Sequence, residues 1–268
     1  MEAKREKKTV QGPVATLRVV AWTFLGVCTL VALFLIYTRI EQFLIRDPRF
    51  ALAAEDAQGL GRTLEVDGAA HASSRAVQAV FSEDYGRSVY LIPLSERRQT
   101  LRSVDWVKDA SLARLWPNRV SVHLVERVPV AFVLLTSSSR ASGARYGLID
   151  EDGVILPPAP DRFGLPVLSG IRLSDSIETR QKRVESMRKL LHDLGEQGRE
   201  ISEVDVSDPD NLKVTEPRDG HMIKLLLGDH NFALRFGNFA THYPEIVQRL
   251  PGAVTLDLRL EDRITVVE

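Results

Sequence analysis

The sequence predicts an α+β protein in which one membrane-spanning helix precedes two folded domains. Three observations support this prediction. Residues 19–38 form an apolar run without a single charge. Apolar residues then recur at a period near two between residues 107 and 128, which is typical of strands with one buried face. Beyond residue 129, short apolar segments alternate with turn residues, and two helical patterns lie among them.

The apolar run predicts a membrane anchor. Twenty helical residues, at a rise of ~1.5 Å each, match the ~30 Å hydrocarbon core of a bilayer. A cleaved signal peptide is the alternative, but its apolar region is ~7–15 residues long and ends in small residues. Here the bulky residues 35–37 lead directly to Arg39. The basic tail, residues 1–18, favours a cytoplasmic N-terminus, so we expect the rest of the chain outside the plasma membrane.

Composition and motifs give no sign of catalysis. The net charge of −1 does not favour nucleic acid as a partner. The single cysteine, Cys28, lies inside the span, and the six histidines have no metal-site spacing. The acidic run 150–152 before Gly153 indicates a turn rather than a catalytic carboxylate pair. We therefore predict no catalytic residue, metal, cofactor or small-molecule substrate.

Residues 50–128 predict a first domain with the order strand, helix, helix, strand, strand. The segment around Gly59 and Gly61 is compatible with either a loop or a broken strand. The expected elements are a strand over 63–68, a helix from Ser73 or Ser74 to Phe81, a helix following Pro93, and two strands that flank Trp116-Pro117-Asn118. Proline fixes its own φ and asparagine tolerates turn geometry, so these three residues predict the hairpin tip.

Residues 129–268 predict a mostly antiparallel β-domain with two helices. Strands are expected over 130–135, 146–150, 154–156, 165–168, 201–206, 212–215, 221–227 and 232–236. Apolar residues Ile177, Val184, Met187, Leu191 and Leu194 indicate a helix that Gly195 ends. A short helix over 243–250 carries Pro244 in its first turn. Residues 254–260 and 264–267 are expected to be extended.

The segment 254–260 is predicted to be an open edge strand. Leu256, Leu258 and Leu260 alternate with Asp257 and Arg259. An edge strand displays unpaired backbone groups to which another chain can add a strand. The leucines could equally face the domain's own core, and both interpretations can hold together. Under the edge hypothesis, a charged residue at Leu258 or Leu260 weakens partner capture and leaves the fold intact.

Three stretches of the sequence carry a family resemblance. The first is Asp105-Trp-Val-Lys-Asp-Ala-Ser, followed by Leu115-Trp-Pro-Asn-Arg and Leu124-Val-Glu-Arg-Val-Pro-Val-Ala131; the second is Phe239-x-x-x-Tyr243-Pro244; the third is Leu256-Asp-Leu-Arg259. In this order they resemble the bacterial cell-division family FtsQ/DivIB. The resemblance implies a cytoplasmic tail (1–18), a transmembrane helix (19–38), a POTRA domain (50–128) and a β-domain (129–268).

The resemblance also implies a function. Members of this family are non-enzymatic scaffolds of the division septum, anchored in the inner membrane with their bulk in the periplasm. They bind FtsB and FtsL and link early to late division proteins, and the POTRA domain contacts upstream proteins. The implied partner-binding residues are Tyr243, Leu256, Leu258, Arg259 and Leu260, with Arg259 facing an acidic partner residue. Leu260 stands where an aromatic residue is usual, residues 261–263 lack the usual glycine, and residues 207–211 lack a second basic contact.

Two other classes of function stay open at this point. An anchored envelope enzyme that acts on peptidoglycan needs a cleft with a perturbed acid, base or metal, and the sequence assigns none. A POTRA-type factor for outer-membrane protein assembly usually carries several POTRA units or a barrel of its own. This chain has room for neither.

Overall fold

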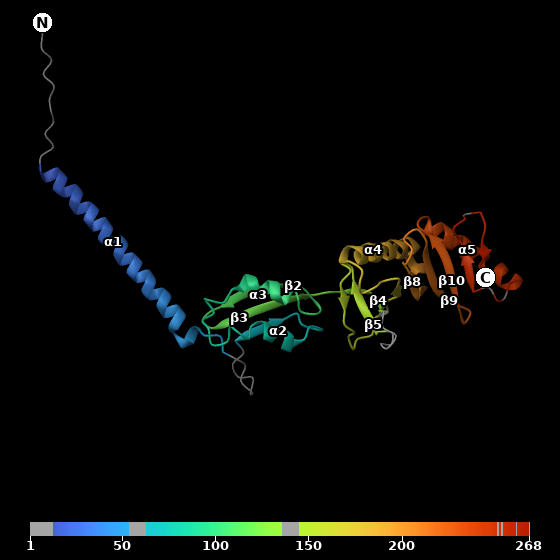
Figure 1. Ribbon diagram of the computed structural model, residues 1–268, viewed down its shortest axis with the longest axis horizontal. Helices are drawn as coiled ribbons and strands as arrows, with labels where there is room; N and C mark the ends of the chain where they lie inside the picture. Colours follow the sequence, from blue (N-terminus) through green and yellow to red (C-terminus); the bar gives the residue numbers. More distant parts are fainter. Residues whose placement is uncertain are drawn as a thin grey trace, which may run out of the picture. The chain divides into compact units, whose positions relative to one another are not determined.

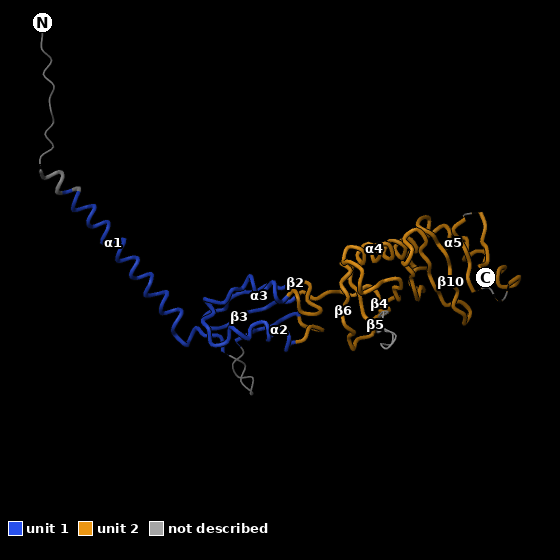
Figure 2. Tube along the Cα trace, viewed as in Figure 1, with its two compact units in different colours: residues 1–68, 74–101, 110–124 blue, residues 69–73, 102–109, 125–268 orange. Residues whose placement is uncertain are grey.

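The computed structural model describes residues 13–53, 63–135, 145–250, 252, 254–260 and 262–267. The chain forms two compact units (Figure 2). The first comprises Met1–Gly68, Ser74–Leu101 and Ala110–Leu124; the second comprises Ala69–Ser73, Arg102–Asp109 and Val125–Glu268. The two units therefore interleave along the sequence near their boundary, whereas the domains predicted from the sequence, 50–128 and 129–268, divide it at one point.

The chain begins with a long helix, α1, over Pro13–Arg46 (Figure 1). Its segment Val20–Arg46 is long and apolar enough to cross a membrane, and its hydrophobic side chains are exposed. The helix runs on past residue 38, the predicted end of the span. It stops before Pro48, which opens a short 3-10 helix, η1, over Pro48–Phe50.

The first unit contains most of a small sheet covered by two helices, in the predicted element order. The elements are β1 (Leu64–Asp67), α2 (Ser74–Val80), α3 (Leu94–Leu101), β2 (Val107–Leu115) and β3 (Arg119–Glu126). The strand order is β1-β3-β2, with β1 parallel to β3. The alternation in β3 is confirmed, because Val120, Val122 and Leu124 are buried. Val128 does not continue it and is 73% exposed.

Gly68 shows how the first strand turns. Its φ is +79°, and a Cβ at this position would lie 2.2 Å from the carbonyl oxygen of Leu124. A side chain would therefore clash with β3 and would also be strained, so this strand end requires glycine.

Over the described ranges, the second unit contains a nine-stranded sheet with the order β12-β11-β10-β9-β8-β7-β4-β5-β6. Its strands are β4 (Pro129–Leu135), β5 (Arg145–Asp150), β6 (Ile155–Leu156), β7 (Val167–Ser169), β8 (Glu203–Asp205), β9 (Leu212–Arg218), β10 (His221–Gly228), β11 (Thr255–Asp257) and β12 (Thr265–Val266). Most neighbouring strands among the described residues pair antiparallel, and the α+β prediction is confirmed. The parallel pairs are β4·β7, β7·β8 and β10·β11.

Helix α4, over Ile177–Leu194, joins the parallel strands β7 and β8. The hydroxyl of Ser176 accepts a hydrogen bond from the backbone N–H of Thr179, which caps the first turn. Gly195 ends the helix with φ +56°, as its position in the sequence predicts. The buried face is Val184, Met187, Leu190 and Leu194; of the other two residues on the predicted helical face, Leu191 packs partly buried against the core and Ile177 is 45% exposed.

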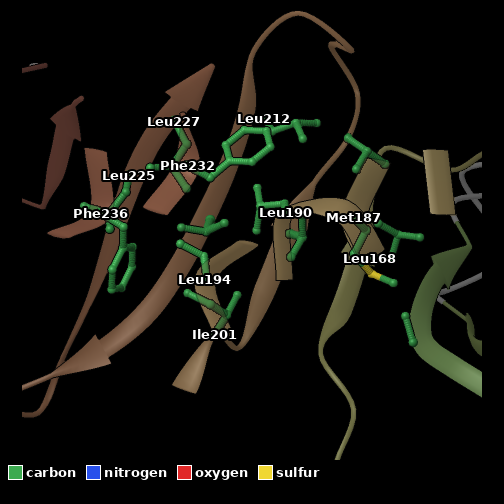
Figure 3. Close-up of a cluster of buried hydrophobic side chains, with 14 of the residues drawn as sticks. Leu168, Met187, Leu190, Leu194, Ile201, Leu212, Leu225, Leu227, Phe232 and Phe236 are labelled. Atoms are coloured by element: carbon green, nitrogen blue, oxygen red, sulfur yellow. The ribbon is translucent and has the colours of Figure 1, made fainter. Parts of the chain in front are cut away.

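Helix α5, over Phe232–Arg249, corrects the largest error of the sequence analysis. Residues 232–236 were expected to be a strand, and Pro244 was expected in the first turn of a later helix. The structure instead has one helix, with Pro244 in its interior. Phe232, Phe236 and Phe239 are buried at spacings of four and three, which is the helical period. Figure 3 shows Phe232 and Phe236 beside Leu225 and Leu227 of β10, in one core with residues of α4.

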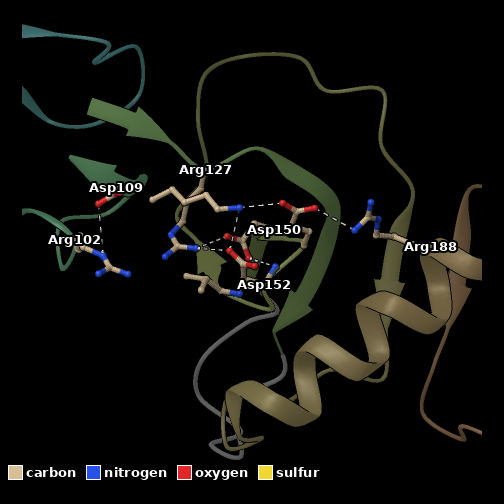
Figure 4. Close-up of polar contacts among 9 residues, drawn as sticks. Arg102, Asp109, Arg127, Asp150, Asp152 and Arg188 are labelled. Atoms are coloured by element: carbon tan, nitrogen blue, oxygen red, sulfur yellow. Dashed lines mark hydrogen bonds and ion pairs between the residues drawn. The ribbon is translucent and has the colours of Figure 1, made fainter. Parts of the chain in front are cut away.

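The acidic run 150–152 is a turn, as the sequence predicts. Asp150 is buried, and its carboxylate accepts backbone hydrogen bonds from Asp152 (3.0 Å) and Val154 (2.8 Å). The guanidinium of Arg127 binds the second carboxylate oxygen of Asp150 (Figure 4). This buried carboxylate therefore builds the β5–β6 hairpin and is occupied by its own neighbours.

A histidine joins three segments of the second unit. His71 Nδ1 lies 2.8 Å from Glu126 Oε2, and its Nε2 lies 2.7 Å from Asp161 Oδ2. The imidazole ring stacks on Trp106 at 4.5 Å between centroids. These hydrogen bonds, first that to Glu126 and then that to Asp161, raise the pKa of His71. Burial alone would raise the pKa of Glu126. The hydrogen bonds that its carboxylate accepts from the backbone of Ala72 and from the imidazole and backbone of His71 outweigh burial, so the pKa is lowered.

Replacing Phe236 by Ala should lower the free energy of unfolding by about 3–5 kcal/mol, because it removes a fully buried aromatic ring. Leu234→Ala is the matched control on the same helix, since Leu234 is 51% exposed, and its effect should stay within about 0.5 kcal/mol. Chemical denaturation of both variants measures the difference. If Phe236→Ala and Leu234→Ala lower the free energy of unfolding by similar amounts, the helix is contradicted, because only a strand places residues 234 and 236 on one face.

The His71 cluster should make stability depend on pH. A histidine whose pKa is raised by folding stabilises the fold fully below its ordinary value of 6.5, and this contribution is lost as the pH rises through the folded value. We expect His71→Gln to cost roughly 2 kcal/mol at pH 6 and much less at pH 9. Thermal unfolding of the detergent-solubilised chain at both values tests this. An equal cost of His71→Gln at both pH values would rule out the charged contact.

Candidate partner-binding edge

In the part of the chain that the structure describes, the C-terminal strands leave one edge of the large sheet open, but not where the sequence pattern predicts it. Strand β11 pairs in parallel with β10 on one side and antiparallel with β12 on the other. The prediction that residues 254–260 form the edge is therefore wrong. The reason is that residues 264–267 fold back along β11, so that β12 is the outermost strand among the described residues.

The backbone of β12 alternates between the ladder and the open side. The N–H of Val267 donates to the carbonyl of Thr255 at 3.0 Å, so this pair is hydrogen-bonded. In an antiparallel ladder the next pair, Leu256 opposite Val266, is then a non-hydrogen-bonded pair. The N–H and C=O of Val266 consequently point away from β11, towards the open edge. This residue therefore offers one donor and one acceptor to an added strand.

The predicted partner-binding residues separate into two groups. Leu256 and Leu258 are 1% and 2% exposed and belong to the core, so the interpretation that they face the domain's own core is confirmed. Leu260 is 55% exposed, and the Arg259 side chain is 48% exposed. Tyr243 is partly buried against Phe239, with ring centroids 5.4 Å apart. Of the five residues, Arg259 and Leu260 therefore have the most exposed side chains.

Arg259 is held by an acidic neighbour within its own chain. Its Nε lies 2.9 Å from Asp257 Oδ1, and its Nη2 lies 2.6 Å from Asp257 Oδ2. The side-chain hydrogen bond from Arg259 lowers the pKa of Asp257. Such a two-pronged pair fixes the plane of the guanidinium. The remaining guanidinium nitrogen, Nη1, is not used in the contact with Asp257.

A groove of about 470 Å³ lies beside this edge. Its apolar lining includes Ile246, Leu250, Leu258, Leu260 and Ile264, and its charged lining includes Arg235, Glu245, Arg249, Asp262 and Arg263. The groove therefore joins the C-terminal half of α5 to the segment that leads into β12. Sequence reasoning missed the contribution of α5, because it placed a strand where this helix begins.

Arg235 is the groove residue most firmly held by the fold. It is 6% exposed, and its Nη1 donates to the carbonyl of Leu227 at 2.6 Å. A buried arginine in the first turns of a helix is not signalled by the residue pattern of the sequence. It ties α5 to the end of β10 and so fixes the position of the groove wall.

Comparison with known proteins matches both parts of the chain. A POTRA domain of the FtsQ type matches residues 61–127, and the C-terminal domain of cell division protein FtsQ/DivIB matches residues 140–259. The chain belongs to the FtsQ/DivIB family of cell division proteins. The resemblance noted in the sequence and the expected POTRA domain are thereby confirmed.

Relatives named cell division protein FtsQ show the same extent of similarity. The Koribacter versatilis protein is 34% identical over 224 residues, which cover 81% of this chain and 60% of that protein. The Bordetella pertussis protein is 30% identical over 112 residues, 40% of each chain. The Novosphingobium aromaticivorans protein is 28% identical over 218 residues, 80% of this chain and 63% of that protein. This chain thus spans less than two thirds of the length of each of these three family members.

The burial of Leu258 changes the expected outcome of charge substitution there. Leu258→Asp should reduce the free energy of unfolding by about 3–5 kcal/mol, because it places an unpaired carboxylate in the core. Leu260→Asp, two residues away on an exposed side chain, should cost no more than about 0.5 kcal/mol. Chemical denaturation compares the two. A Leu258→Asp variant as stable as Leu260→Asp would show that the core does not include residue 258.

Proposed function

We propose that this chain is a membrane-anchored, non-enzymatic scaffold of the bacterial division machinery. It holds FtsB- and FtsL-type partners at the septum and links early to late division proteins, with the POTRA domain serving upstream partners. The observation that carries the proposal is the outward-facing backbone of β12 beside the groove of α5. Membership of the FtsQ/DivIB family supports the assignment to division.

The proposed topology has the N-terminus in the cytoplasm, α1 across the inner membrane, and the chain beyond α1 in the periplasm. The apolar part of α1 and the basic residues before it support this orientation. A tether confines the binding edge to a thin layer beside the membrane. Partners that are themselves anchored there meet it at high effective concentration, so a modest intrinsic affinity is sufficient for capture.

The proposed binding mode is strand addition at β12. A partner segment in extended conformation pairs with the N–H and C=O of Val266, and its alternate side chains meet apolar residues of this chain. Val266 and Val267 are each 40% exposed, and Leu260 and Val254 are more exposed still. The mixed charges along the groove then select the register of the partner, because a mismatched charge costs affinity.

Arg259 and Tyr243 take separate roles in this proposal. Arg259 presents Nη1 to an acidic partner residue, while Asp257 holds the guanidinium in place. Tyr243 packs against Phe239 and β9 rather than on the edge: its ring and that of Phe239 each lie 6.0 Å from the guanidinium carbon of Arg218 in β9. Leu256 and Leu258 contribute by packing β11 into the core, which positions β12.

Val266→Pro tests strand addition directly. Proline removes an N–H that faces the open edge and takes no hydrogen bond from the β11 ladder, so the fold should persist. We expect co-purification of the FtsB-type partner from membranes to fall at least about tenfold, a change that corresponds to ~1.4 kcal/mol.

Val266→Thr is the matched control, because it keeps the backbone N–H and a β-branched side chain. Its recovery of partner should equal that of the unchanged chain. If Val266→Pro captures as much partner as Val266→Thr while both unfold at the same temperature, β12 is not the pairing strand.

A further inference from the structure

An aromatic cluster lies where α1 meets the rest of the first unit. The ring of Phe43, on α1, lies 5.6 Å from that of Phe50, and Phe50 lies 5.7 Å from Trp116, both in edge-to-face contact. Trp116 stands at the tip of the β2–β3 hairpin. Phe43 and Trp116 are each 49% exposed, so the rings of the cluster pack against one another and still present apolar surface to the outside.

Hydrogen bonds fix this cluster to the end of α1. The buried hydroxyl of Ser88 donates to the carbonyl of Leu44 at 2.7 Å, and the N–H of Val89 donates to the carbonyl of Phe50 at 2.8 Å. The helix end and the small domain are therefore joined by more than a covalent linker. The hairpin tip therefore lies beside the part of α1 that carries Phe43.

That level corresponds to the interfacial region of a bilayer. The charge-free run ends at Thr38, and Phe43 lies five residues further along the helix, ~7 Å at the helical rise. The headgroup region extends ~5–7 Å beyond the hydrocarbon core on each side. If Thr38 marks the edge of the hydrocarbon core, Phe43 and the two rings packed edge-to-face in the same cluster lie among the lipid headgroups.

The exposed residues around the cluster have the composition of a membrane-interface anchor. Ile40 is 55% exposed on α1, and Tyr90 and Leu91, next to Ser88 and Val89, are 41% and 39% exposed. The guanidinium of Arg49 lies 5.6 Å from the Phe43 ring centre and is tied to Asp47. Tryptophan and tyrosine with neighbouring arginine are the residues enriched at the membrane–water boundary. Exposed aromatic rings of this kind need a partner that is apolar on one side and wet on the other.

We propose that the hairpin tip around Trp116 docks into the headgroup region of the bilayer that α1 spans. The occupant of the open aromatic surface is the lipid of that membrane, because the surface is continuous with the spanning helix itself. The contact holds the POTRA-type domain against the membrane. It is independent of the partner-binding edge at β12.

Depth-dependent fluorescence quenching tests this docking in the full-length chain. In a Cys28→Ser background, single cysteines at Asn118→Cys and Asp67→Cys carry an environment-sensitive fluorophore. Asn118 is part of the hairpin tip, whereas Asp67 is paired with His123, ~13 Å further along β3 from the tip. The protein is reconstituted into phosphatidylcholine–phosphatidylglycerol vesicles that contain headgroup-spin-labelled lipid and no other protein.

We expect at least threefold stronger quenching of the Asn118→Cys label than of the Asp67→Cys label. Adding Phe43→Ser and Trp116→Ser should reduce the tip signal to the level at Asp67. Equal quenching at the two positions in the otherwise unchanged chain would overturn the proposal and leave a protein as the occupant of the cluster. Undiminished tip quenching in the double serine variant would also overturn it, since the aromatic rings would not be the anchor.

Discussion

The packing of α5 against the large sheet determines the C-terminal architecture. Phe232, Phe236 and Phe239 bury one face of the helix, and this burial makes residues 232–249 a crossover between two strands. A helical crossover brings the chain back to the starting end of the sheet, so β11 pairs with β10 in parallel. The chain must then reverse to continue along the sheet, and that reversal places β12 on the outside.

The same crossover explains why buried and exposed residues alternate over a few positions near the C-terminus. Leu256 and Leu258 are enclosed because β11 has a strand on each side and α5 packs beside the sheet. Arg259 and Leu260 lie just beyond the last paired residue and are exposed. The edge proposed for binding is thus supported by a hydrophobic core one strand away, which keeps its backbone geometry fixed.

Residue patterns predicted most of the fold because most elements have one clear period. The alternation of Val120, Val122 and Leu124 and the Gly195 stop of α4 each have one physical interpretation. Residues 232–236 do not, since phenylalanines four apart fit one face of a strand as well as one face of a helix. Pro244 strengthened the wrong interpretation, because proline within a helix costs ~3 kcal/mol and usually marks a helix start. The buried aromatic face outweighs that cost.

The position of the open edge could not be predicted for a different reason. Two short extended segments follow α5, and strand order depends on tertiary pairing, which neither segment encodes in its own residues. Residues proposed to bind through backbone atoms, such as Val266, also leave no chemical signature in a side chain. The exposure of Leu260 and Arg259 likewise follows from the end of the ladder at Asp257 rather than from their alternation with Leu258.

The short length of β12 limits how long a partner strand, added as proposed, remains bound. The strand covers only Thr265–Val266, and one of those residues directs its backbone outward. A ladder with so few bonds gives a fast dissociation rate, and most differences in affinity between related complexes reside in that rate. Under the proposed strand addition, an assembly joined at this edge would exchange its subunits readily once they leave the membrane. Such lability suits a structure that a cell builds and dismantles in every generation.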